Sequence, residues 1–305
     1  MARVEATRHT AFQMADMNKV KNLGKQAEAT LEGAARAATH QAAPQLEALA
    51  RFGYASKGVV YGTIGLLALS LALGRRGAAT DAQGALLHLQ DLPGGGLLLW
   101  LLVLGLIGYA LWQLIRAALD PEQQGADGKG LAKRLGYLVS GLGNLGVALF
   151  AAKLAMQGSA ARNANSEQDT VRQILSWPGG QLLLGLVGLA LLGVAGNSIY
   201  SAYGAKFMKR MAFTDVGARF SEQLKKIGQV GLSARGVVMG IIGASLLVAA
   251  FRDRAGSVLG SSEVLTWLGY QPAGKLLLGV VALGTVCYGL WCFVQARYRR
   301  IRVEG

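Results

Sequence analysis

The sequence LPGGGLLL at residues 92–99 recurs twice along the chain, as WPGGQLLL at 177–184 and as QPAGKLLL at 271–278. A second motif precedes each copy, in the order RFGYASKG at 51–58, RLGYLVSG at 134–141 and QVGLSARG at 229–236. Self-similarity at a fixed period indicates tandem copies of one supersecondary unit. The chain is therefore predicted to contain three repeats, at 51–120, 132–205 and 228–300.

Each repeat contains two apolar stretches long enough to cross the roughly 30 Å hydrocarbon core of a membrane. The six stretches lie within 53–73, 94–115, 136–156, 181–203, 231–251 and 276–296. Backbone polar groups in lipid must bond within the segment, so these runs predict helices. The composition agrees, because 52% of the 305 residues are hydrophobic and only 16% are charged, against about 25% charged in an ordinary soluble protein. We predict an all-α integral membrane protein.

The number of spans in each repeat also predicts how the repeats are related. Because two spans return the chain to the side it came from, all three repeats should enter the membrane from the same side. They should then be parallel repeats about an axis along the membrane normal, in a pseudo-threefold bundle of six transmembrane helices. A short helical pattern before each proline suits an interfacial helix or a lid.

At these matching motifs the chain resembles a bacterial family catalogued as a domain of unknown function, number twelve hundred and six. The resemblance covers about residues 51–300, and its most specific marks are the three glycine-containing entries and the three proline-containing starts. It implies six transmembrane helices in three two-helix repeats. It implies no activity and no functional residues.

The distribution of Lys and Arg predicts the orientation. Of the 31 such residues, 21 lie in both terminal segments and the two loops between repeats, and only 7 lie in the three loops within repeats. The positive-inside rule then places both termini in the cytoplasm, at a bacterial inner membrane. The net charge of +14 is explained by this topology and by attraction to anionic lipid head groups, so we expect no nucleic-acid binding.

The first fifty residues form an Ala-rich basic tail outside the repeats. Lysines accompany a weakly amphipathic pattern between residues 19 and 31. Such a segment suits a helix lying on the inner leaflet, and the alternative is a docking arm for a membrane-protein partner.

Reactive side chains are scarce in the predicted spans. All 17 acidic residues and all three His lie outside them. Proton-coupled carriers commonly use buried carboxylates or histidines, and a serine nucleophile needs a neighbouring base. We therefore expect neither a proton pump nor an enzyme, and no cofactor or metal.

Glycines recur at corresponding positions of the first helix in repeats 1 and 3. They are Gly58, Gly62, Gly65, Gly236, Gly240 and Gly243. Small residues at this spacing let helix backbones approach closely in membranes. These positions are predicted to be helix-packing faces, at which leucine should be destabilising.

A cation stands directly before the first of these glycines in two repeats. Lys57 and Arg235 correspond to each other, and Ser140 takes their place in repeat 2. One hypothesis is a partial cationic ring that contacts the phosphate of an anionic lipid or another anion. The other is that both side chains reach out to the interface as membrane anchors, as cations near helix ends usually do.

Two asparagines break the repeat pattern inside the spans. Asn144 and Asn197 stand at similar predicted depth in the two helices of repeat 2. They could form an interhelical hydrogen bond worth about 1 kcal/mol, or they could line a polar cavity for a small molecule or lipid. In the second case four aromatic residues would bound the cavity: Tyr109, Trp112, Tyr288 and Trp291.

These observations favour a non-catalytic inner-membrane protein that serves as a scaffold or accessory subunit of a larger assembly. The alternative is a transporter, channel or lipid-binding or small-molecule-binding protein with a cavity near the repeat axis. A dry axis filled by Leu and Gly would support the first function, and a polar cavity would support the second.

Overall fold

The computed structural model describes residues 30, 33, 43–158, 167–205, 207–208, 211–213, 218–252 and 258–300, so most of the N-terminal tail lies outside the described residues. Six helices are long and apolar enough to cross a membrane, as predicted. They are α2 (Ala43–Ala72), α4 (Gly95–Ala118), α5 (Gly128–Gln157), α7 (Gly180–Tyr203), α9 (Ser221–Arg252) and α11 (Gly274–Tyr298). Each repeat also has a short helix between its two long ones: α3 (Ala82–Gln90), α6 (Glu167–Leu175) or α10 (Ser261–Gly269).

The proline-containing motif is the turn that joins each short helix to the long helix after it. The residue before the long helix has a left-handed backbone in every repeat, with φ of 76° at Gly94, 81° at Gly179 and 61° at Ala273. The next residue is glycine each time, because a Cβ there would collide with a carbonyl near the end of the short helix. These three residues are Gly95, Gly180 and Gly274.

The three leucines of each motif set the rotation of the long helix. The first leucine is exposed in every repeat, at 70% for Leu97, 71% for Leu182 and 69% for Leu276. The third leucine is buried in every repeat, as Leu99, Leu184 and Leu278. Two positions along a helix turn the side chain by about 200°, which explains the change of side. The same face of the second helix therefore points inward in all three repeats.

Ala273 is the one motif position at which the residue conflicts with the backbone. The left-handed conformation costs an L-residue roughly 1–2 kcal/mol and costs glycine little. We expect Ala273→Gly to raise the free energy of unfolding by about 1 kcal/mol, measured by thermal unfolding in mild detergent. The control is Ala155→Gly inside α5, which should lower stability by about 1 kcal/mol. A similar loss in both variants would contradict the backbone argument.

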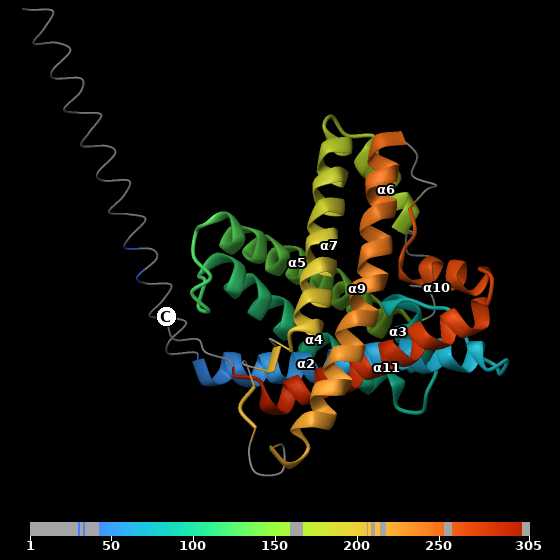
Figure 1. Ribbon diagram of the computed structural model, residues 1–305, viewed down its shortest axis with the longest axis horizontal. Helices are drawn as coiled ribbons and strands as arrows, with labels where there is room; N and C mark the ends of the chain where they lie inside the picture. Colours follow the sequence, from blue (N-terminus) through green and yellow to red (C-terminus); the bar gives the residue numbers. More distant parts are fainter. Residues whose placement is uncertain are drawn as a thin grey trace, which may run out of the picture.

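The most extensive packing between long helices joins different repeats. α4 packs on α5, α7 on α9, and α11 on α2. Figure 1 shows α2 and α11 lying side by side, with α7 and α9 paired along a different direction. Because the last long helix packs on the first, the three repeats form a closed ring.

One contact recurs at all three of these interfaces. A Cβ built on the first-helix glycine would lie 2.8 Å from the Phe293 ring at Gly58, 3.0 Å from Leu114 at Gly141, and 2.6 Å from Ile199 at Gly236. These three partners occupy the same position of the second helix, counted from its proline. A pseudo-threefold arrangement of the repeats would produce this pattern of contacts.

Packing within the repeats is unequal. α2 packs closely on α4 and α9 packs closely on α11, whereas α5 and α7 contact each other much less. Repeat 2 is therefore the loosest part of the ring.

Only some of the glycines in the predicted packing faces lie at close contacts between helices. Gly65 approaches the backbone of Val286, with 2.6 Å between a built Cβ and the Val286 nitrogen, and Gly243 similarly approaches the Gly188 carbonyl at 2.9 Å. The expected destabilisation by leucine needs correction at Gly62 and Gly240, where a built Cβ has room. A Cβ on Gly62 would meet nothing within 4 Å, and one on Gly240 would make only an ordinary contact of 3.7 Å. Gly62 still lies at the predicted helix contact, because a Cβ built on Gly289 of α11 would be 2.7 Å from the Gly62 nitrogen.

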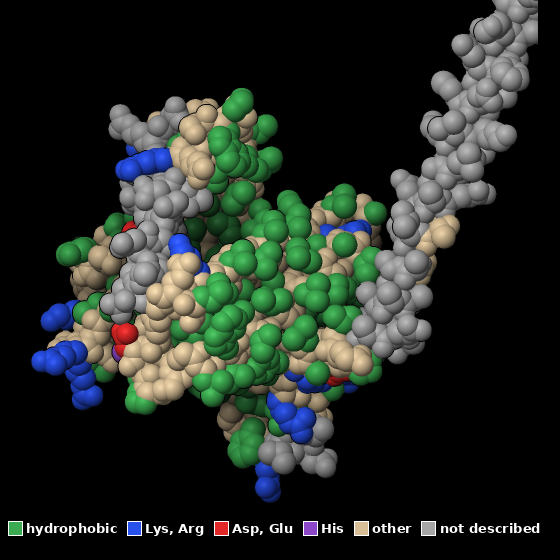
Figure 2. All heavy atoms as spheres, turned by 180° about the vertical axis from the view of Figure 1, so that it is seen from behind, with side chains coloured by type: hydrophobic (Ala, Val, Ile, Leu, Met, Phe, Trp, Pro, Cys, Tyr) green, Lys and Arg blue, Asp and Glu red, His purple; other side chains and the backbone are tan. Residues whose placement is uncertain are grey.

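The outer surface of the bundle is strongly apolar. Figure 2 shows hydrophobic side chains over much of one face, with Lys and Arg side chains mostly toward its margins. Exposed hydrophobic side chains occur on all six long helices. An apolar expanse of this kind is typical of a surface in contact with lipid.

Candidate functional site

A cavity of about 290 Å³ lies where the three repeats meet. Its lining comes from α2, α4, α5, α7 and α9, together with the starts of α3 and α10. Two sets of corresponding residues converge on it. The first set is Lys57, Ser140 and Arg235, and the second set, one helical turn further on, is Tyr61, Asn144 and Met239.

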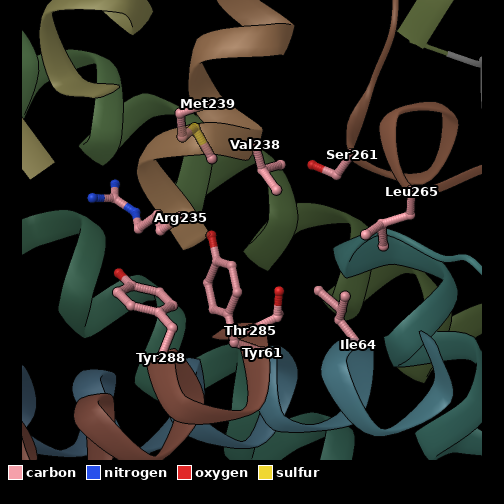
Figure 3. Close-up of a pocket in the computed structure, with 9 residues that line it drawn as sticks. All are labelled: Tyr61, Ile64, Arg235, Val238, Met239, Ser261, Leu265, Thr285 and Tyr288. Atoms are coloured by element: carbon pink, nitrogen blue, oxygen red, sulfur yellow. The ribbon is translucent and has the colours of Figure 1, made fainter. Parts of the chain in front are cut away.

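A smaller cavity of about 40 Å³ adjoins the larger one and shares four lining residues with it: Tyr61, Arg235, Met239 and Ser261. Figure 3 shows its walls, with Arg235 and Met239 from α9 facing Tyr61 from α2 and Tyr288 from α11. The two cavities together place polar groups from repeats 1 and 3 around one space.

Lys57 is the most deeply buried cation of the site. Its side chain is 2% exposed and lies in the middle of α2. The ammonium nitrogen is 4.1 Å from the centre of the Tyr109 ring and 5.6 Å from that of Tyr61. A membrane anchor would keep its ammonium in water, so the burial of Lys57 argues against an anchor role.

Arg235 enters the same cavity from α9. Its Nη1 donates a hydrogen bond to the Ser198 hydroxyl at 3.3 Å, and its guanidinium carbon is 5.4 Å from the centre of the Tyr288 ring. Its Nε is buried and has no hydrogen-bond partner. The guanidinium is thus only partly satisfied by the protein.

The two cations repeat one arrangement. Tyr109 and Tyr288 occupy the same position of the second helix in repeats 1 and 3, so each cation lies against the corresponding tyrosine of its own repeat. In repeat 2 both partners differ, because Ser140 replaces the cation and Val194 replaces the tyrosine. The site is therefore cationic on two sides and small and neutral on the third.

The positive charge of the cavity has little compensation from the protein. Among the described residues, no carboxylate lies within 4 Å of the Lys57 ammonium or the Arg235 guanidinium. Asp81 lines the cavity, but its carboxylate accepts a hydrogen bond from the Gly84 nitrogen at 2.8 Å and caps α3. A buried charge without an ionic partner is costly, so an anion entering this space would be stabilised.

The structure separates the two asparagines that the sequence placed together. Asn144 lines the cavity and donates a hydrogen bond to the Ser140 carbonyl of its own helix at 2.7 Å. Asn197 is exposed, because α7 packs on α9 through the opposite face, which includes Ala195 and Ser198. The expected pairing of Asn144 with Asn197 must be corrected.

The four aromatic residues predicted around the asparagines are all buried. Tyr109 and Tyr288 lie against the cations, and Tyr288 lines the smaller cavity. Trp112 and Trp291 do not line either cavity. Only the two tyrosines therefore belong to the site.

A second polar cluster, which sequence reasoning missed, lies at the ends of α4 and α11. Glu122 accepts from Arg116 Nη2 at 2.7 Å and from Arg299 Nη2 at 3.3 Å. Both arginines are buried, at 3% and 8% exposure. Burial lowers the pKa of Arg299, but Tyr54 and Glu122 raise it by more, so its pKa lies above the ordinary arginine value. This cluster ties the first repeat to the last.

Comparison with known proteins agrees with the repeat structure. Residues 52–120, 135–205 and 230–299 each match the family described as Domain of Unknown Function (DUF1206). A protein of Bacillus subtilis (strain 168), named Uncharacterized protein YxxB, is 32% identical over 262 residues, which cover 86% of this chain and 94% of that protein. No solved structure matches the chain. With three copies of the matching segment and a relative aligned over most of its length, the chain belongs to the DUF1206 family.

Proposed function

We propose that this multi-pass membrane protein binds an anionic ligand in the central cavity. The observation that carries the proposal is the placement of Lys57 and Arg235 in one cavity without an ion-paired carboxylate among the described residues. The volume of about 290 Å³ is close to the lower end of the range of small-molecule sites, roughly 300–1,000 Å³. A phosphate-sized or carboxylate-sized group with a short substituent fits this space.

The proposal takes up the alternative function that the sequence left open. A polar cavity is the feature that was expected to favour ligand binding over a scaffold. The scaffold role depended on a partner for residues 1–50, most of which lie outside the described residues, and it stays a prediction. We further propose a binding role without catalysis, in a bacterial inner membrane with both termini cytoplasmic, a topology supported by the bias of Lys and Arg.

Replacing the cations tests the proposal. We expect the double variant Lys57→Met, Arg235→Met to lose the thermal stabilisation that anions give the wild-type chain in mild detergent. A ligand at 100 times its dissociation constant stabilises a folded protein by about 2.7 kcal/mol. The probes are inorganic phosphate, glycerol 3-phosphate and phosphatidylglycerol. Without any ligand the double variant should unfold at a higher temperature than the wild type, because two costly buried charges are gone.

The matched control is Lys129→Met, which removes an exposed cation at the start of α5. It should respond to every anion as the wild type does. If none of the three anions stabilises the wild type more than the double variant, the central cavity is not an anion site.

A further inference from the structure

The side of the cavity formed by repeat 2 differs from the other two sides. Repeats 1 and 3 present a cation backed by a tyrosine, whereas α5 and α7 present mainly small and apolar residues to the cavity. They include Gly136, Val139, Gly143, Val147, Leu191 and Val194. Apart from Ser140 and Asn144 this wall is apolar, so most of it suits a hydrocarbon chain.

The same side is where the ring of repeats is most loosely packed. α5 and α7 pack together much less than the corresponding helices of repeats 1 and 3. Gly143 is exposed although it lines the cavity, and a Cβ built on it would meet nothing within 4 Å. On α7, Gly193 and Gly196 also have open space around them. In Figure 2 the surface is recessed between the projecting end of α7 and α9 and the neighbouring end of α4 and α5.

The position of this opening limits what can pass through it. Gly143 stands in the middle of α5 and Leu191 in the middle of α7, both within candidate membrane spans. An opening there faces lipid chains, not water. Gly143 is three residues beyond Ser140, the counterpart of the two cations, or about 4.5 Å further along the helix. An anionic group at the cations would thus lie beside a lateral exit for an apolar chain.

We propose that the ligand is an anionic phospholipid that enters sideways from the bilayer between α5 and α7. This inference rests on the proposed anion site. The phosphate lies between Lys57 and Arg235, and at least one acyl chain leaves along Val147 and Leu191 past Gly143. The open, apolar side of repeat 2 is what selects a lipid over a water-soluble phosphate.

The test narrows the opening without touching the cations. Gly143→Trp places a large side chain at the mouth, and Gly146→Trp is the matched control. Gly146 is on the same helix, is equally exposed and has equally open surroundings, but does not line the cavity. The full chain is purified in mild detergent, and retained phosphatidylglycerol is measured by native mass spectrometry, with phosphatidylcholine and glycerol 3-phosphate as comparison probes. Thermal unfolding confirms that each variant is folded.

We expect Gly143→Trp to reduce retention of phosphatidylglycerol at least tenfold and Gly146→Trp to leave it unchanged. The wild type should prefer phosphatidylglycerol over phosphatidylcholine and over glycerol 3-phosphate. Equal retention by the two tryptophan variants would overturn the lateral route, and so would glycerol 3-phosphate binding as tightly as the lipid. If the Lys57→Met, Arg235→Met variant still loses anion binding in either case, the proposed function stands; if that variant binds anions normally, the proposed function itself fails.

Discussion

Gly289→Ala is expected to lower the free energy of unfolding by about 2–3 kcal/mol, although it adds only one methyl group. A Cβ on Gly289 would lie 2.7 Å from the Gly62 nitrogen and 3.0 Å from its Cα, so the added group meets backbone. The helix α2 cannot rotate this contact away as a side chain could, and α11 would have to separate from it. Because this interface closes the ring of repeats, the loss should appear in thermal unfolding of the whole bundle.

The facing residue supplies the matched control. Gly62→Ala adds the same methyl group on the other side of the same interface, where it meets nothing within 4 Å. Since alanine is a better helix former than glycine, this variant should be up to about 1 kcal/mol more stable than the wild type. Equal effects of the two substitutions would show that the α2–α11 contact differs from the one described.

Glu122→Gln is expected to cost about 3–5 kcal/mol, because it leaves two buried arginines without their shared carboxylate. Arg116 and Arg299 both bind this carboxylate, at 2.7 Å and 3.3 Å. Glutamine keeps the shape of the side chain but not its charge, so the effect reports on the ion pairs. The measurement is the midpoint of thermal unfolding in mild detergent.

Glu222→Gln is the control for this charge effect. Glu222 pairs with Lys225 at 3.5 Å, but its side chain is 72% exposed. Exposed pairs contribute about 0–1 kcal/mol, so this variant should be nearly as stable as the wild type. If Glu122→Gln were equally mild, the Arg116 and Arg299 charges would have to be compensated in another way.

The architecture could be predicted because short local motifs determine it. The sequence LPGGGLLL contains the turn, the close approach at its second glycine and the rotation of the helix that follows, and each of these depends on residues next to one another. Six spans follow from length and apolar composition in the same way. The family match and the six long helices confirm this part of the prediction.

The candidate site was harder to predict, because it depends on which way each helix face points. The repeats show that Lys57 and Arg235 occupy corresponding positions. A cation near a helix end is usually a membrane anchor, however, and no neighbouring residue distinguishes an anchor from a ligand-binding cation. Residue spacing predicts how deep Asn197 lies in the membrane, but not which way its side chain faces. Asn197 is exposed because α5 and α7 pack together so little. Arg116 follows the end of an apolar run, and its burial depends on Glu122 and on Arg299 at the far end of the chain.

The closed ring has a consequence for synthesis at the ribosome. The main packing partner of α2 is α11. The first span therefore lies in the bilayer without this partner until the last span has been synthesised. About 200 residues separate the end of α2 from the start of α11, which at roughly 5–20 residues per second takes about 10–40 seconds. During that interval the glycine face of α2 is available to lipids and to any other helix in the membrane. A chain truncated before α11 therefore lacks the last span and also leaves α2, in the first repeat, without its main packing partner.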